Sequence, residues 1–379
     1  MNTTWKTICL AIRASLFKET QSFPVDVNWD DVFMESKKQA IASIVRAGVK
    51  NSLPSSLALS WNLFSAQEVG FTVQLMNAQR ELTELLEYHG INYKILKGTA
   101  AAIYYPEPYY RTMGDIDFWV LIDQFDSACD IVAKNGYTKS LRSDERHIKL
   151  IKNNILFEMH RHVSNTENDK PLDLYIERAG AERGCIRDTE FWMLPELENG
   201  LVLLNHLRQH LIEGLGIRQV LDWMMYCDRC IDAEKWQEML PFIRKLGLEK
   251  LAITTTHLCV MHFGLKVDWC EGEDELSELL LESIIQSGNF GKIHGNGRNV
   301  ERVYVNIKKK GLIRYLQQAG EANWIAVQKH SWLRPFAWIY QIGRYIIQAL
   351  DSGRIGSRLK EDMRRSNNRY ELLKRLELL

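Results

Sequence analysis

Residues 114–120 constrain the fold of this chain more than any other segment. Their sequence, Gly-Asp-Ile-Asp-Phe-Trp-Val, places two aspartates one residue apart at the start of an apolar run. Such a run predicts a β-strand, whose successive side chains point to opposite faces, so Asp115 and Asp117 share one face. Two carboxylates in one small volume repel each other unless water or a cation lies between them. The segment therefore predicts either a solvated edge strand or a site for a hard divalent cation.

A strand, a glycine turn and a helix precede this pair. Residues 92–96 predict a short strand, Gly98 follows it, and residues 100–105 predict a helix that ends before a proline. The free N–H groups at the start of a helix attract phosphate, and Lys97 and Thr99 can add contacts to it. Taken alone, the same residues also fit an ordinary turn with a solvated lysine.

A second acidic strand is predicted at residues 155–160. Its alternation places Glu158 and His160 on one face, beside the aspartate pair if the two strands are neighbours. Asp173, within the apolar run 172–176, is the alternative third acid. We favour Glu158 because an imidazole follows it on the same face.

From about Leu96 to Asp222 the chain resembles the uncharacterised bacterial nucleotidyltransferase-like family of the DNA polymerase β superfamily. The superfamily pattern is a glycine turn, a strand with two acids and a third acid on a neighbouring strand. Many active members carry Gly-Ser at the turn, where this chain has Lys-Gly-Thr. The residues that carry the resemblance are Leu-Lys-Gly at 96–98, Tyr-Pro-Glu-Pro at 105–108, Arg111, Gly-Asp-Ile-Asp at 114–117 and Phe-Glu-Met-His at 157–160.

The resemblance implies an α+β fold with a polymerase-β-like nucleotidyltransferase core, a mixed sheet with helices. It also implies a metal-dependent enzyme that transfers a nucleoside monophosphate from a nucleoside triphosphate to a hydroxyl of a small molecule, a protein or a nucleic acid end. Asp115, Asp117 and Glu158 would be the catalytic acids and would bind Mg²⁺ or Mn²⁺. The residues implied to bind the nucleotide are Lys97, Gly98, Thr99, Arg111 and His160.

Three alternatives stay open. Arg111 has a planar guanidinium suited to phosphate, and it fits equally well in an ion pair that anchors a loop. The chain can be a D-x-D glycosyltransferase that uses a nucleotide sugar and manganese, although such enzymes usually open with alternating strands and helices, whereas this chain opens with helices. It can also be a catalytically silent nucleotide-binding or interaction module of the same fold.

Four polar residues of the C-terminal half form a secondary candidate group. His206 and His210 lie four residues apart on one helical face, as do Arg218 and Asp222 on the next helix. The acid of an H-E-x-x-H zinc motif is missing between the histidines. We therefore expect a hydrogen bond between helices, from His206 to Asp222, rather than a second metal site, and leave open a nucleotide or acceptor role for Arg218.

Composition indicates a globular protein of several domains. The chain has 379 residues, of which 46% are hydrophobic and 25% charged, and it lacks a run of 18 uncharged apolar residues. Seven scattered cysteines and the absence of a secretory signal predict a reducing, cytoplasmic location. We expect an N-terminal helical region at 1–75, a nucleotidyltransferase catalytic domain at 76–197 and a C-terminal α-helical domain at 198–379.

The charge is unevenly distributed along a chain that is neutral overall. Residues 298–379 hold 17 basic and seven acidic residues, against 31 and 41 in the rest. The excess of +10 predicts either a surface that contacts a polyanion or basic helical faces that complement the acidic remainder. In the first case the polyanion is a nucleic acid, a membrane surface or an acidic substrate.

Overall fold

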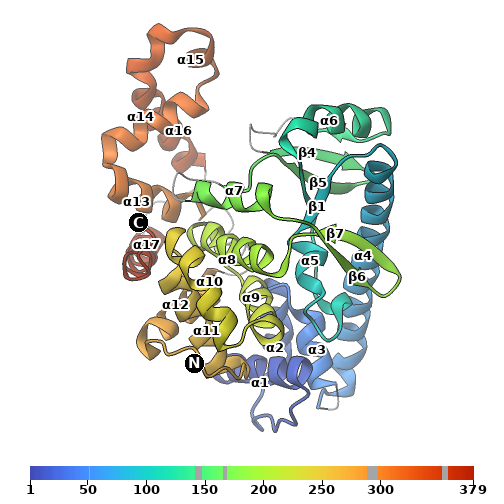
Figure 1. Cartoon of the computed structure of the whole chain (residues 1–379). Helices are drawn as coiled ribbons and strands as arrows, with labels where there is room; N and C mark the ends of the chain where they lie inside the picture. The colour runs from blue at the N-terminus through green and yellow to red at the C-terminus, as the bar shows by residue number, and fades with distance from the viewer. Residues whose placement is uncertain (51, 141–146, 165–168, 288–297, 352–356) are drawn as a thin grey trace.

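The chain folds into a mixed α+β protein, as the sequence predicts, in which helices pack on both faces of one β-sheet (Figure 1). The N-terminal helices lie below the sheet, and the C-terminal helices form a larger block beside it. This computed structural model describes residues 1–50, 52–140, 147–164, 169–287, 298–351 and 357–379.

The sheet has seven strands in the order β3-β4-β5-β2-β1-β7-β6. β2 lies in the middle, antiparallel to β1 and parallel to β5. Its register places Asp117 opposite Leu96 on one side and Glu158 on the other. The strands are β1 Tyr93–Leu96, β2 Ile116–Val120, β3 Thr138–Lys139, β4 His147–Lys152, β5 Ile155–His160, β6 Glu182–Ile186 and β7 Thr189–Met193.

The two faces of the sheet pack against different parts of the chain. Phe118 and Phe157 point to one face, where they join a core with α4 (Ser55–Tyr88) and α6 (Phe125–Lys134). Trp119 belongs to the core that faces the C-terminal helices. Asp117 and Glu158 alternate with the buried phenylalanines and so lie on the Trp119 face.

The N-terminal region is helical, as predicted. Its helices are α1 Thr3–Phe17, α2 Trp29–Lys38, α3 Ala42–Val49 and the long α4. Apolar side chains on one side of α1, which include Trp5, Ile8 and Ile12, are buried. Helix α4 runs without a break across residue 75, where the first domain boundary is predicted, and the domain division stays a prediction.

From Glu196 onward the described residues contain helices and connecting segments and no strand, as predicted. None of the helices in the described part of the chain is long and apolar enough to cross a bilayer. The described residues also include the short helical segments η1 Pro108–Tyr110, η2 Ile122–Gln124, η4 Cys259–Phe263 and η6 Ser331–Phe336. The helices from Glu196 onward are α8 Glu196–Glu213, α9 Ile217–Cys230, α10 Ala233–Lys245, α11 Glu249–Leu258, α12 Asp274–Ser287, α13 Arg298–Lys310, α14 Leu312–Asn323, the short α15 Ile325–Lys329, α16 Ala337–Asp351 and α17 Ser357–Arg375.

The apolar run 172–176, which carries Asp173, is part of helix α7 (Lys170–Arg178), because Leu172 and Ile176 are buried four residues apart while Leu174 between them is half exposed. The helix predicted at 100–105 is the five-residue α5 (Gly98–Ala102), which ends in turns before Pro106.

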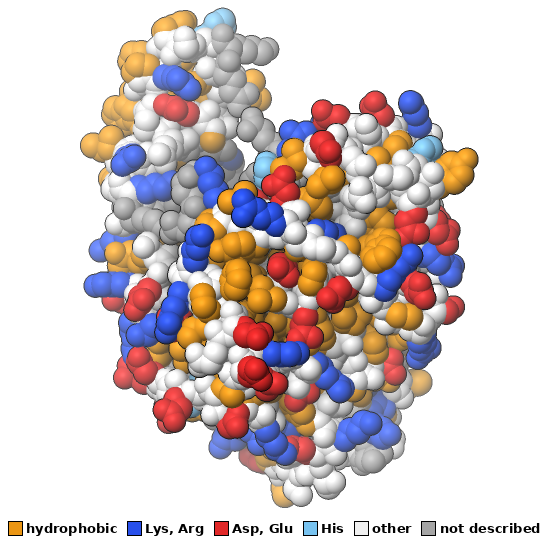
Figure 2. Space-filling view, viewed as in Figure 1, with side chains coloured by type: hydrophobic (Ala, Val, Ile, Leu, Met, Phe, Trp, Pro, Cys, Tyr) orange, Lys and Arg blue, Asp and Glu red, His pale blue; other side chains and the backbone are white. Residues whose placement is uncertain are grey.

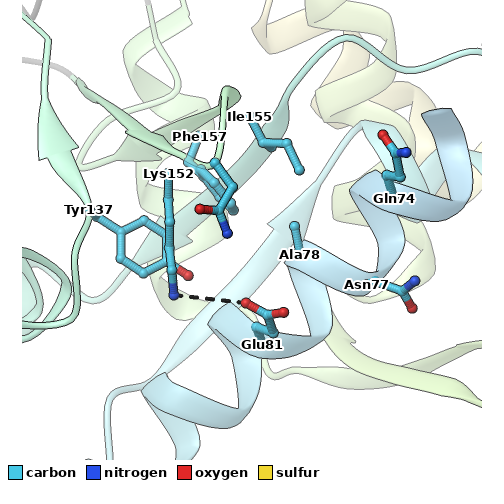
Figure 3. A pocket seen from close by; sticks show the side chains of 9 residues that line it. Gln74, Asn77, Ala78, Glu81, Tyr137, Lys152, Ile155 and Phe157 are labelled. Carbon is cyan, nitrogen blue, oxygen red and sulfur yellow. Dashed lines mark ion pairs between the residues drawn. The ribbon is translucent and has the colours of Figure 1, made fainter.

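A cavity of about 270 Å³ lies between α4 and the strands β4 and β5 (Figure 3). Glu81 and Lys152 face each other across it at 3.8 Å, and Phe157 lines its wall. Phe157 and Glu158 point to opposite faces of β5. The cavity is therefore separated from the carboxylates by the sheet, and the candidate site is defined by its side chains instead.

Candidate metal and nucleotide site

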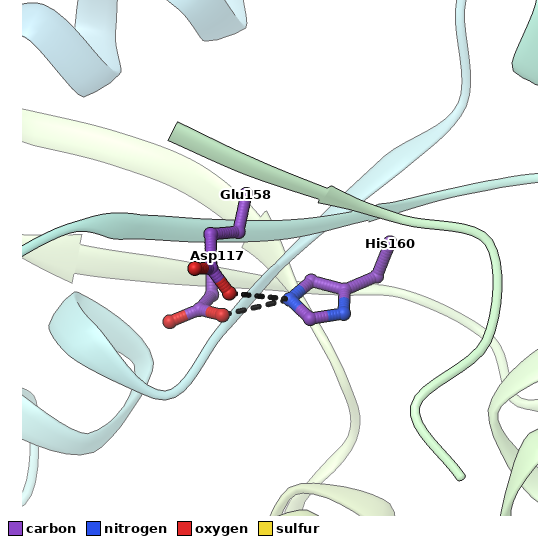
Figure 4. A group of neighbouring side chains, drawn as sticks. All are labelled: Asp117, Glu158 and His160. Atoms are coloured by element: carbon purple, nitrogen blue, oxygen red, sulfur yellow. Dashed lines mark hydrogen bonds and ion pairs between the residues drawn. The ribbon is translucent and has the colours of Figure 1, made fainter. Parts of the chain in front are cut away.

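The central group of the site is formed by side chains on two neighbouring parallel strands. Asp117 on β2 stands opposite Glu158 on β5, and His160 lies two residues further along β5 on the same face. One potential ligand atom from each of the three lies within 4.8 Å of those of the other two (Figure 4). The predicted neighbourhood of the two acidic strands is therefore confirmed by the register.

His160 connects the two acids. Its Nε2 lies 2.7 Å from Oδ1 of Asp117 and 3.9 Å from Oε2 of Glu158. The ring of His147, on β4, stacks on it at 5.3 Å. Because β4 pairs with β5, His147 is directly opposite His160, and the two rings close one side of the acidic group.

Two lysines neutralise the acids in this structure. Nζ of Lys97, just after β1, lies 2.8 Å from Oδ1 of Asp117. Lys149, on β4 opposite Glu158, forms an ion pair with that carboxylate. The site is thus a cluster of alternating charges, in which the carboxylates are paired by protein cations.

Asp115 lies just before β2 and completes the acidic set. Burial, followed by the charges of Asp117 and Glu158, raises the pKa of Asp115 to about 7. Burial alone would raise the pKa of Asp117 as well, but the ammonium of Lys97 and the hydrogen bond from His160 outweigh it and lower that pKa. Burial in turn disfavours the charged form of Lys97, yet the three acids raise its pKa overall.

The turn that carries Lys97 has an unusual backbone. Lys97 has φ 52° and ψ −125°, a region that side chains with a Cβ rarely adopt, and Gly98 follows with φ 21°. The turn directs the lysine side chain back over the acids of β2. Such a conformation persists only where the surrounding structure holds it, and here the ion pair of Lys97 with Asp117 contributes to that.

Thr99 is buried and already has a partner. Its hydroxyl donates to Oε1 of Gln79 on α4 at 2.7 Å, and it faces away from solvent. Helix α5 has only five residues, so few peptide dipoles add up at its start. Of the turn residues expected at the nucleotide, Lys97 and Gly98 are the ones beside the acids, since Gly98 packs against Met113 and the backbone of Asp115.

Arg111 is buried in a two-point ion pair. Its Nη2 and Nε lie 2.7 and 3.0 Å from the two carboxylate oxygens of Asp222 on α9. The hydroxyl of Tyr105 donates to the same carboxylate, and Arg218 donates to the carbonyl of Thr112. These contacts fasten the loop that leads into β2 onto α9, which agrees with the loop-anchoring interpretation of Arg111.

The expected hydrogen bond from His206 to Asp222 is wrong. Asp222 is used by Arg111 and Tyr105, and Nε2 of His206 lies 2.7 Å from Nε2 of His210 on the same helix. Burial, and next the neighbouring His210, lower the pKa of His206 well below its usual value. The two imidazoles are not part of the three-residue ligand group found among the described residues.

Asp173, the alternative third acid, is placed elsewhere. Its carboxylate accepts hydrogen bonds from the backbone N–H groups of Val163 and Ser164 and so caps the segment that follows β5.

Sequence reasoning missed Lys149 and His147. Both lie on β4, whose alternation of polar and apolar residues from 147 to 152 is a strand signal. This alternation predicts a strand, but it does not predict that the strand pairs with β5, which is what brings Lys149 and His147 to the site.

The donor set fits a divalent cation of intermediate hardness. Carboxylate oxygens from Asp117 and Glu158 suit Mg²⁺ and Mn²⁺, and the imidazole of His160 suits Mn²⁺ better than Mg²⁺. Asp115 is not part of this three-residue ligand group, but its carboxyl group is close enough for the charges of Asp117 and Glu158 to raise its pKa.

Comparison with known proteins gives a family match and likenesses among solved structures. The model of a family described as uncharacterised nucleotidyltransferase matches residues 26–264, which include every acid of the site. No curated protein sequence matches the chain.

Among solved structures, the chain is similar to the crystal structure of an antigenic nucleotidyltransferase-like protein from Paracoccidioides brasiliensis. The identity is 12%, and the likeness covers 46% of this chain and 92% of that chain with a TM-score of 0.30. A TM-score this low supports no argument about fold or function.

Proposed function

The chain belongs to the family of uncharacterised nucleotidyltransferases, and on that premise we propose that it transfers a nucleoside monophosphate from a nucleoside triphosphate to a hydroxyl acceptor. The proposal includes Mg²⁺ or Mn²⁺, bound by Asp115, Asp117 and Glu158. The observation that carries it is the placement of Asp117 and Glu158 opposite each other on parallel strands, with Lys97 beside them.

The proposed reaction forms one bond and breaks one. The acceptor oxygen attacks the α-phosphorus, the bond from that phosphorus to the bridging oxygen breaks, and pyrophosphate leaves. The hydroxyl proton passes to Glu158 or to water. A bound divalent cation supplies positive charge to the attacking and leaving oxygens.

Each residue of the cluster has a proposed part. Asp117 is held in its ionised form by Lys97 and His160, as a ligand for a cation requires. Glu158, which is ion-paired with Lys149 in this structure, is proposed to accept the proton of the acceptor hydroxyl. His160 holds the carboxylate of Asp117 in place and is proposed to contact a nucleotide phosphate.

Lys97 is proposed to move from Asp117 to the triphosphate when a cation binds. Its ammonium and the cation would otherwise compete for the same carboxylate oxygen. Gly98, which has no side chain, leaves space for the phosphates beside the turn. Thr99 and Arg111 are proposed to act indirectly, by holding the turn on α4 and the β2 loop on α9.

The test is a pyrophosphate-release assay with the four nucleoside triphosphates, Mg²⁺ or Mn²⁺ and a panel of hydroxyl acceptors. We expect metal-dependent release by the wild type and a loss of at least about 100-fold in Asp117→Asn, because the principal ligand is removed. Asp123→Asn is the matched control, since Asp123 carries the same group on the exposed η2 segment. Equal activity of Asp117→Asn and the wild type contradicts the proposal.

A catalytically silent module is the second candidate. The observation that favours it is the pairing of Asp117 and Glu158 with Lys97 and Lys149, which neutralises both carboxylates without a metal. Such a module binds a triphosphate with equal affinity in EDTA and in Mg²⁺. The enzyme requires that Mg²⁺ strengthens triphosphate binding, so calorimetric titration under the two conditions separates the two functions.

A further inference from the structure

The region from α14 to α16, residues 312–351, projects as a lobe away from the sheet and the helical block (Figure 1). It follows α13 and consists of α14, α15, η6 and α16, of which α14 and α16 pack against each other as a hairpin. It contains four basic and two acidic residues among forty. This low charge is unusual for a projecting segment, which water surrounds on most sides.

The interior of this lobe combines Leu316 and Val327, which are 7% and 6% exposed, with small and polar residues. Gly320 packs so closely on Ala337 that a Cβ on the glycine would lie 1.9 Å from the alanine carbonyl oxygen. Gln341 is only 1% exposed and lies 3.3 Å from the side chain amide of Asn323. The hydroxyls of Tyr315 and Tyr345 are 2.8 Å apart, and the rings of Trp324 and Tyr340 stack.

The exterior of the lobe holds the large aliphatic and aromatic side chains. Ile313, Ile325 and Trp332 are 69–75% exposed, and Ile346 and Ile347 are 55% and 61% exposed. Figure 2 shows hydrophobic side chains along the outer edge of the lobe. The further exposed members are Leu312, Phe336, Trp338, Ile339, Tyr340 and Ile342. More large apolar side chains of the lobe are exposed than buried, which is unusual for a surface that meets only water.

The exposed face is too broad for a narrow groove. At about 100° per residue, the exposed residues of α16 from Trp338 to Ile347 cover roughly 200° of the helix circumference. A face this wide suits a helix that lies partly embedded at the boundary of a lipid bilayer, with its apolar side chains in the boundary and its remaining side toward the protein and water.

The exposed charges around this face are positive. Arg314 and Arg334 are the exposed charged side chains described within the lobe, and Lys308 and Lys310 are exposed at the end of α13, directly before it. Glu321, the described acid of the lobe, is partly buried and accepts from Gln317. Exposed tryptophan and tyrosine beside lysine and arginine are the side chains found where a protein meets lipid headgroups.

We propose that residues 312–351 dock the protein on the surface of an anionic lipid bilayer. The exposed isoleucines and aromatic rings enter the headgroup region, and Lys308, Lys310, Arg314 and Arg334 contact lipid phosphates. The lobe lies on the membrane and does not cross it, because α14 has 12 residues and α16 has 15, whereas a spanning helix needs about 20.

The test is flotation of the full chain with vesicles of phosphatidylcholine alone or with about 30% phosphatidylglycerol. We expect binding to the anionic vesicles that weakens as salt rises, because the basic residues supply part of it. Ile346→Asp/Ile347→Asp should reduce the bound fraction at least about tenfold. The matched control is Leu59→Asp/Leu63→Asp on α4, where the side chains are 67% and 58% exposed, and it should bind like the wild type.

Three results overturn the proposal. The first is that the wild type does not float with anionic vesicles, and the second is that the α4 control loses binding as fully as the α16 variant. The third is a wild-type dimer in light scattering that Ile346→Asp/Ile347→Asp converts to a monomer while flotation is unchanged, which assigns the face to a second copy of the chain. Circular dichroism melting of each variant verifies that a loss of binding is not a loss of folding.

Discussion

Lys97 lies with its Nζ 2.8 Å from Oδ1 of Asp117, so a protein cation lies against a carboxylate that we assign to a metal ion. The strand register explains the contact, because Leu96 stands opposite Asp117 and the lysine follows at the turn. The ammonium of Lys97 and a divalent cation would therefore compete for the same carboxylate. If they do, removing the ammonium should make the unfolding free energy of the protein depend more strongly on metal.

Lys97→Met should make the protein depend on Mg²⁺ for stability. Without the ammonium the buried carboxylate of Asp117 keeps only His160, so the free energy of unfolding without metal should fall by about 3 kcal/mol. Mg²⁺ should recover much of this loss, because a ligand that binds only the folded state stabilises it. Urea unfolding in EDTA and in Mg²⁺ measures the difference.

Lys94→Met is the matched control for this experiment. Lys94 is also a buried lysine of the same segment, but its ammonium donates to the backbone carbonyls of Ile176 and Ala179. The variant should lose stability while its gain from Mg²⁺ stays that of the wild type. If Mg²⁺ raises the unfolding free energy of Lys97→Met no more than that of Lys94→Met, then the ammonium of Lys97 and the metal ion do not compete for Asp117.

The pair of Arg111 and Asp222 should be strongly coupled. Asp222→Asn leaves a buried guanidinium without its charge partner and should cost about 3 kcal/mol of unfolding free energy. In a double-mutant cycle with Arg111→Met, the interaction energy should exceed about 2 kcal/mol. Chemical denaturation of the four proteins measures it.

The same variants decide between the two roles of Arg111. If it only anchors the loop, Arg111→Met and Asp222→Asn should weaken triphosphate binding by similar factors. A much larger loss of nucleotide affinity in Arg111→Met would show that the guanidinium contacts phosphate directly.

Thr99→Val should lower stability without changing nucleotide affinity. The substitution removes the hydrogen bond to Gln79 and leaves the glutamine oxygen buried without that donor, which should cost about 1 kcal/mol. The hydroxyl faces α4, so the triphosphate should bind with the wild-type dissociation constant. Triphosphate binding that is weaker by tenfold or more would instead show that the Thr99 hydroxyl contacts phosphate, as the family resemblance implies.

Metal binding should become stronger as the pH rises toward 7. The pKa of Asp115 is raised to about 7, so at lower pH its carboxyl group is protonated and a metal ion must displace the proton. The dissociation constant for Mn²⁺ should fall by up to about tenfold per pH unit between pH 5.5 and 7 and level off above. Calorimetric titration with Mn²⁺ in buffers of different ionisation enthalpy measures how many protons the protein releases when the metal binds.

The same raised pKa predicts the pH dependence of stability without metal. The folded protein keeps a proton on Asp115 that the unfolded chain has released above about pH 4. The unfolding free energy contributed by this group is therefore present at low pH and is lost as the pH rises through 7. Asp115→Asn should flatten both pH profiles, and profiles as steep as those of the wild type would exclude Asp115 as their source.

The sequence predicts the acidic core of the site because that information is local. Alternation along a strand determines that Asp117 points away from Phe118 and that Glu158 points away from Phe157. The glycine after residue 97 marks the turn, and the acidic strands pair as expected. These features depend on residues next to one another, which a sequence displays directly.

The sequence does not predict the partners that arrive from distant segments. Asp222 pairs with Arg111 across 111 positions of sequence. The hydroxyl of Thr99 donates to Gln79 on α4, which precedes it in the chain. Around Asp173, the residues Leu172, Leu174 and Ile176 alternate as in a strand, yet burial follows the helical period. Only the packed fold decides between two periods over so short a run.

The most direct measurement of the central claim is a crystal of the protein soaked with Mn²⁺ and a non-hydrolysable nucleoside triphosphate, with data collected at the manganese absorption edge. The account predicts an anomalous peak within about 2.5 Å of carboxylate oxygens of Asp117 and Glu158, with Lys97 turned from Asp117 to the phosphates. A site without anomalous density there, with Lys97 still on Asp117 and nucleotide bound elsewhere, would contradict it.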